Sequence, residues 1–106
     1  EGVPPVMRHA ARVMPEMLGE HVRGKMFAMP PEGGALDDET RTLIYLGAAL
    51  ASSSHECVKA MSALATRQGI AREKLLETFK IARLAVASGI IGNAEPLLAA
   101  LDHAES

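Results

Sequence analysis

Apolar residues recur every three or four positions along most of the chain, which is the spacing of amphipathic α-helices. No stretch alternates apolar and polar residues convincingly, as a half-buried strand would. The pattern therefore predicts an all-α fold of five or six helices. We expect these helices at about residues 4–13, 15–26, 38–50, 55–68, 72–88 and 93–103.

Short polar residues and glycines mark several of the expected helix ends. Asp37 is a natural N-cap, because its carboxylate can accept a backbone N–H from the first turn. The serines at 52–54 weaken or end that helix, because their hydroxyls compete for backbone groups. Gly69 ends the following helix as a C′ glycine. Gly89 and Gly92 are expected to break the long helix that begins near residue 72.

The apolar faces are built mainly from Ala, Leu and Met, because aromatic residues make up only 3% of the chain. With 106 residues and 48% hydrophobic content, the chain is expected to form one domain over residues 1–106. A monomer of this size buries only a modest share of its surface. Wide apolar faces therefore favour a helical protein that completes its core as a homo-oligomer. The residues expected to face inward on the long helix are Leu75, Leu76, Phe79, Ala82 and Val86.

Charge and length exclude several classes of partner. The formal net charge of −2 leaves no basic excess to neutralise a nucleic acid, and the scattered Lys and Arg do not suit an anionic membrane surface. The apolar run 43–51 is too short to span a bilayer. Residues 1–5 lack the basic and apolar regions of a signal peptide. A single cysteine forms no internal disulfide, which predicts a reducing, cytoplasmic location.

The candidate chemistry lies in residues 54–61, Ser-His-Glu-Cys-Val-Lys-Ala-Met. Cys57 is near the start of its expected helix, where unpaired N–H groups favour an anion such as a thiolate. His55 is the candidate base, although residues two apart do not share a helix face. The other reading of Cys57 is a buried small apolar residue. Ser54 could cap the helix by accepting the Cys57 N–H.

The four histidines have no metal-ligand spacing, so we expect no metal site and no cofactor.

Three stretches together resemble the carboxymuconolactone decarboxylase superfamily, and within it the alkylhydroperoxidase D-like branch. These stretches are residues 34–44, the segment around Cys57, and residues 69–75. The resemblance covers roughly residues 15–98. It implies an all-α fold and assembly into trimers or hexamers.

The resemblance also implies roles for individual positions. In the peroxidase branch a Glu precedes the motif Cys-x-x-Cys-x-x-x-His, and Cys57 matches the second, attacking cysteine. Ser54 stands at the resolving cysteine, Met61 at the histidine and Thr42 at the acid. The implied activity is a single-cysteine peroxidase that an external thiol regenerates. The decarboxylase branch also places a histidine at the position of Met61, so decarboxylation gets no support.

Three functions therefore compete. The first is an antioxidant thiol peroxidase that uses Cys57. The second is a non-catalytic oligomeric member that binds a small apolar ligand beneath Cys57, and the third is a structural or interaction protein that uses the same oligomeric surface. The resemblance favours the first, and the residue content favours the second or third.

Overall fold

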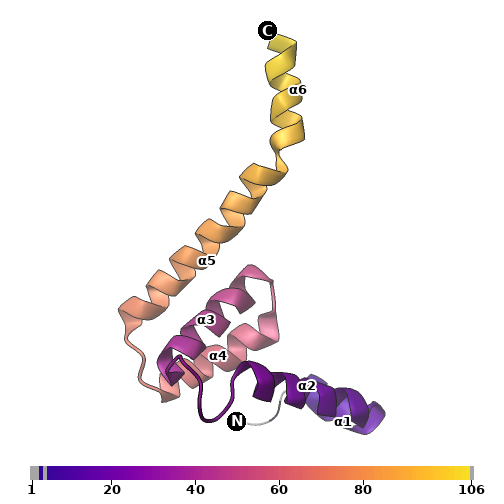
Figure 1. Cartoon of the computed structure of the whole chain (residues 1–106), viewed down its shortest axis with the longest axis vertical. Coiled ribbons are helices and arrows are strands. Elements are labelled where there is room, and N and C mark those ends of the chain that lie inside the picture. The colour runs from indigo at the N-terminus through magenta and orange to yellow at the C-terminus, as the bar shows by residue number, and fades with distance from the viewer. Residues whose placement is uncertain (1–2, 4, 106) are drawn as a thin grey trace. The chain divides into compact units, whose positions relative to one another are not determined.

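The structure, a computed structural model, describes residue 3 and residues 5–105. The described residues form six helices and no strand (Figure 1), which confirms the predicted all-α fold. The helices are α1 Pro5–Val13, α2 Pro15–Ala28, α3 Asp38–Ala51, α4 His55–Arg67, α5 Arg72–Asn93 and α6 Glu95–Glu105. The proposed opening of the first helix at Pro4 lies outside the described residues.

The expected break at Gly89 and Gly92 is wrong, because α5 continues through both glycines to Asn93. Neither glycine takes a left-handed backbone conformation. A glycine inside a helix costs only about 1 kcal/mol relative to alanine, and a 22-residue helix can absorb that cost. The chain bends instead at the next residue, and α6 continues at 47° to α5.

The chain divides into two compact units, residues 1–41 and 42–106. In the first unit α1 packs against α2, and α2 ends shortly before Pro30-Pro31, two residues later than expected. The first unit ends on a confirmed cap at the start of α3. There the Thr40 N–H donates to Asp37 Oδ1 at 2.8 Å, and the Arg41 guanidinium donates to the Pro30 carbonyl at 2.6 Å.

The second unit holds a small core of mostly small side chains. Its buried residues are Thr42, Leu46, Ala49, Ala65, Ile70 and Ala82. Alanine at three of these positions lets helices approach closely but buries little apolar area.

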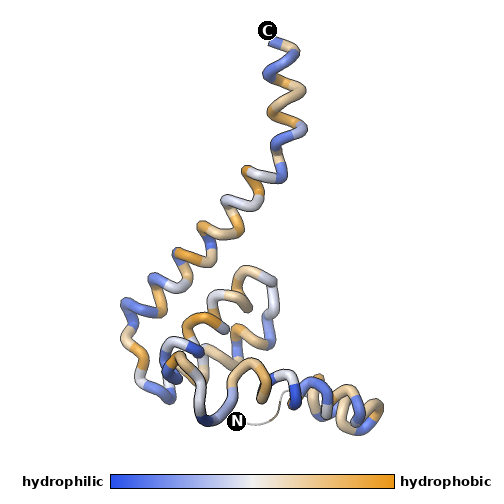
Figure 2. Tube along the Cα trace, viewed as in Figure 1, coloured by the Kyte–Doolittle hydropathy of each residue, from blue (hydrophilic) through white to orange (hydrophobic). Residues whose placement is uncertain are grey.

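The predicted inward face of α5 is largely wrong for the single chain. Ala82 is buried, but Leu76, Phe79 and Val86 are exposed. The reason is that α5 is a long helix with few neighbours. Figure 2 shows apolar and polar residues interspersed along α5 and α6.

Among the described residues, no single helix is long and apolar enough to cross a membrane. Within the described part of the chain, one bent pair, α5 with α6, reaches that length and composition.

Candidate functional site

Cys57 lies next to the hydroxyl of Tyr45. The Tyr45 Oη and Cys57 Sγ atoms are 3.6 Å apart, which is within hydrogen-bond range for sulfur, and either group could donate. Tyr45 comes from α3 and Cys57 from the first turn of α4, and Figure 1 shows these two helices side by side. Both side chains are half-buried. The thiol is therefore held by a neighbour and is still open to a small reagent.

The turn between α3 and α4 sets the position of Cys57. Ser53 adopts a left-handed backbone conformation with φ of 60°. The Ser54 N–H donates to the Ala49 carbonyl at 2.9 Å, and the Ser53 N–H donates to the Leu50 carbonyl at 3.4 Å. These two bonds form a Schellman motif, which satisfies free carbonyls at the end of α3. The chain can therefore reverse within three residues and start α4 at His55.

The expected side-chain cap from Ser54 to the Cys57 N–H is absent, because the Ser54 side chain makes no capping hydrogen bond. Its backbone, with φ of −89° and ψ of 82°, departs from the extended conformation typical of a capping residue. Its main chain serves the turn instead, and its carbonyl accepts the Val58 N–H at 3.0 Å.

The pKa of the Tyr45 phenol is raised above its ordinary value of 10.0. The main cause is the hydrogen bond with Cys57, followed by burial and by the negative charge that Cys57 carries when ionised. The phenol therefore keeps its proton throughout the neutral range. It can donate that proton in a hydrogen bond to the sulfur when the thiol ionises.

The position that the peroxidase resemblance assigns to an acid has a structural role here. Thr42 is buried, and its hydroxyl donates to Gln68 Oε1 at 2.8 Å. Gln68 follows the last residue of α4, whereas Cys57 lies in the first turn of that helix. Thr42 thus ties the start of α3 to the far end of α4.

The remaining candidates lie around Cys57 on the same helix. His55 is the first residue of α4 and is exposed. Residues two apart on a helix point in different directions, so His55 and Cys57 do not share a face. Met61 lies one turn after Cys57 on the same face and is half-buried.

Sequence reasoning missed Tyr45. It is the chain's one tyrosine, and its hydroxyl stands in an otherwise apolar stretch of α3. It also follows Thr42 by three residues, which places both on one side of the helix. A polar group on the buried side of the helix before the cysteine was the available signal.

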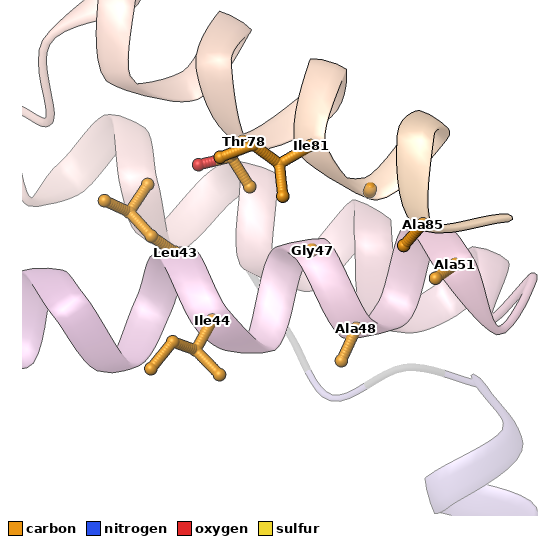
Figure 3. Close-up of a pocket in the computed structure, with 9 residues that line it drawn as sticks. Leu43, Ile44, Gly47, Ala48, Ala51, Thr78, Ile81 and Ala85 are labelled. Carbon is orange, nitrogen blue, oxygen red and sulfur yellow. The ribbon is translucent and has the colours of Figure 1, made fainter. Parts of the chain in front are cut away.

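A separate apolar groove lies between α3 and α5 (Figure 3), with a cavity volume of about 420 Å³. Its lining residues are Leu43, Ile44, Gly47, Ala48 and Ala51 of α3, and Thr78, Ile81, Ala82 and Ala85 of α5. Cys57 is not among them, so this groove is not the cavity that was expected beneath Cys57.

The groove has almost no polar lining. Its one polar side chain is Thr78, and the Thr78 hydroxyl already donates to the Lys74 carbonyl at 2.8 Å. The two helices approach closely at Gly47, where an added Cβ would lie 3.5 Å from Thr78 Cγ2. The described residues contain no group of three or more His, Cys, Asp or Glu side chains that could hold a metal ion.

Residues 17–100 match the model of the carboxymuconolactone decarboxylase family, a range that includes Tyr45, Cys57 and the α3–α5 groove. Among curated proteins, none matches the sequence. The family match covers well over half of the 106 residues, and the chain therefore belongs to the carboxymuconolactone decarboxylase family.

Proposed function

We propose that the chain is a single-cysteine hydroperoxidase of the alkylhydroperoxidase D-like kind, with Cys57 as the nucleophile. The observation that carries the proposal is the Tyr45 hydroxyl, 3.6 Å from a half-buried thiol in the first turn of a helix. A thiol needs a donor, a cation or a helix N-terminus to hold it as the reactive thiolate. Cys57 has a hydroxyl neighbour that can donate, Tyr45, and it lies at a helix N-terminus.

In the proposed reaction the Cys57 thiolate attacks one peroxide oxygen of a hydroperoxide, ROOH. An S–O bond forms as the O–O bond breaks, and the leaving alkoxide takes up a proton from solvent and departs as ROH. The sulfur is oxidised by two electrons to sulfenic acid. An external thiol then displaces water to give a mixed disulfide. A second external thiol releases Cys57 and leaves as the oxidised disulfide of the reductant.

Tyr45 would act as the fixed hydrogen-bond donor of this site. Its raised pKa keeps the phenol protonated while the thiol ionises, so the donor and the anion can coexist at neutral pH. In the peroxidase branch a Glu and a His supply the protons, and the matching positions here hold Thr42 and Met61. A phenol one turn along α3 from Thr42 would supply the hydrogen bond to sulfur instead.

Catalytic turnover tests the proposal. The protein is incubated with an organic hydroperoxide and a small thiol, and peroxide loss is followed for wild type, Cys57→Ser and His55→Ala. We expect wild type to exceed Cys57→Ser clearly. His55→Ala tests the other candidate base, and we expect its rate to stay close to that of wild type. Equal peroxide loss by wild type and Cys57→Ser would remove the peroxidase proposal.

A second candidate is a non-catalytic oligomeric protein, and the α3–α5 groove favours it. The groove is apolar and lies on a different face of α3 from Tyr45, so it could bind an apolar partner with no chemistry at Cys57. Under that function, Cys57→Ser would leave the binding of the partner unchanged.

A further inference from the structure

Two apolar surfaces of the second unit have no partner within that unit. One is the α3–α5 groove. The other is the face of α6 formed by Leu97, Leu98 and Leu101, which are 60%, 53% and 53% exposed. No residue of α6 is buried.

The α6 of the same chain cannot reach the groove. The last groove residue on α5 is Ala85, and α5 then continues for about two more turns before it ends at Asn93. At that point the chain bends by only 47°. Figure 1 shows α6 continuing beyond the end of α5 rather than turning back along it.

The two surfaces fit each other in size and chemistry. The α3 side of the groove, from Leu43 to Ala51, is about 12 Å long, and the 11 residues of α6 span about 16 Å. Small side chains such as Ala48 and Ala85 form much of the groove, which leaves room for larger side chains of an incoming helix. With no free polar side chain in its lining, the groove suits leucines better than a polar ligand.

The exposed apolar area of α5 and α6 is also large enough for a protein interface. The exposed large apolar side chains of α5 and α6 are Leu76, Phe79, Ile81, Leu84, Val86, Ile90, Ile91, Leu97, Leu98 and Leu101. Roughly half exposed, these side chains together present on the order of 1,000 Å² of apolar surface. A stable interface buries about 800 Å² on each partner.

From these observations, we propose that α6 of a second copy of this chain docks into the α3–α5 groove, with its leucines against the alanines of the groove. Since each chain carries both surfaces, reciprocal exchange closes as a dimer and head-to-tail exchange closes as a ring. The inference does not depend on the chemistry of Cys57, so it can fail or stand independently of the peroxidase proposal.

Disulfide trapping between copies tests the docking. In the full chain carrying Cys57→Ser, Ala48→Cys places a thiol in the groove and Leu98→Cys places one on the apolar face of α6. The two variants, one with a mass tag, are mixed and oxidised. We expect a mixed disulfide between tagged and untagged chains. The matched control replaces Leu98→Cys with His103→Cys, on the opposite side of α6. We expect the control to cross-link at least tenfold less.

Light scattering after size exclusion supplies a second readout that needs no engineered thiol. Leu98→Glu should lower the assembled mass while circular dichroism keeps its helix content, because Leu98 is exposed in the single chain. The docking proposal is overturned by equal cross-linking from Leu98→Cys and His103→Cys. It is equally overturned by a monomeric wild type, or by a monomer that retains a small apolar compound in native mass spectrometry.

Discussion

At the scale of single residues, the pair formed by Tyr45 and Cys57 departs from the pattern of the peroxidase branch. Ser54, Thr42 and Met61 stand where the peroxidase resemblance places a resolving cysteine, an acid and a histidine. The Thr42 hydroxyl instead makes a structural hydrogen bond to Gln68. The structure nevertheless places the Tyr45 hydroxyl, from the same helix as Thr42, 3.6 Å from the Cys57 sulfur. A phenol differs from a carboxylate in that it holds its proton at neutral pH, so it can stabilise a thiolate but cannot deprotonate the thiol.

Tyr45→Phe removes this donor and keeps the ring. A hydrogen bond of this kind contributes about 1 kcal/mol net, so we expect the thiolate fraction at neutral pH to fall roughly fivefold. The rate at which iodoacetamide alkylates Cys57 should fall in proportion. Thr42→Val is the matched control on the same helix, and alkylation at the wild-type rate in Tyr45→Phe would contradict the donor role.

The titration of Tyr45 gives a pH-dependent test. Because Tyr45 is the one tyrosine and the chain has no tryptophan, ultraviolet absorbance follows this phenol directly. We expect its midpoint to lie above 10.0 in wild type and to move back toward 10.0 in Cys57→Ala.

The raised pKa of Tyr45 also determines how the stability of the fold changes with pH. A pKa raised by folding adds stability that is complete below the unfolded value and is lost as pH rises through the folded value. The stability advantage of wild type over Tyr45→Phe should therefore shrink above pH 10.0. If the stability advantage of wild type over Tyr45→Phe grew above pH 10.0, the raised pKa of Tyr45 would be contradicted.

At the scale of helices and turns, α3 and α4 end in the same way with different residues. Each ends in a Schellman motif. Gly69 holds the left-handed position after α4 with φ of 69°, and the Ile70 N–H donates to the Ala65 carbonyl at 3.1 Å. After α3 the left-handed position belongs to Ser53, whose Cβ makes that conformation unfavourable. The turn that positions Cys57 is thus the more strained of the two.

Ser53→Gly should relieve this strain. We expect the free energy of unfolding to rise by about 0.5–1 kcal/mol, because glycine adopts the left-handed conformation without a steric penalty. Gly69→Ala, the matched change at the other turn, should lower stability by a similar amount. Chemical denaturation measures both, and a destabilising Ser53→Gly would show that the serine side chain supports the turn.

Helix positions were largely predictable from sequence because capping residues mark the helix ends. Asp37 and Gly69 act through backbone groups a few residues away, so local sequence is sufficient to identify them. The Tyr45–Cys57 contact was not predictable in this way, since it depends on how α3 packs against α4. The predicted break of α5 at Gly89 was wrong for a related reason, because the rest of a long helix outweighs one local weakness.

At the scale of the whole molecule, few of the described apolar side chains are buried. The buried apolar residues are Leu46, Ala49, Ala65, Ile70 and Ala82, three of which are alanines. Burial of so few apolar side chains contributes only a small part of the free energy that keeps a domain of about 100 residues folded. The apolar faces of α5 and α6 therefore account for more potential stabilisation than the core of the single chain.

The thermal midpoint should consequently depend on protein concentration. Association that occurs only in the folded state raises the midpoint by mass action. We expect a rise of several degrees between micromolar and hundred-micromolar protein, and a smaller rise for Leu98→Glu. Scanning calorimetry at several concentrations measures this, and a midpoint independent of concentration would point to a chain that is stable alone.

The most direct test of the account is the capture of oxidised Cys57. The protein is treated with one equivalent of cumene hydroperoxide in the presence of dimedone, which reacts with a sulfenic acid but not with the sulfoxides that the six methionines can form. Peptide mapping by mass spectrometry then locates the adduct. The account predicts an adduct on Cys57 in wild type and several-fold less in Tyr45→Phe. Oxygen found only on methionines, with no adduct on Cys57, would contradict it.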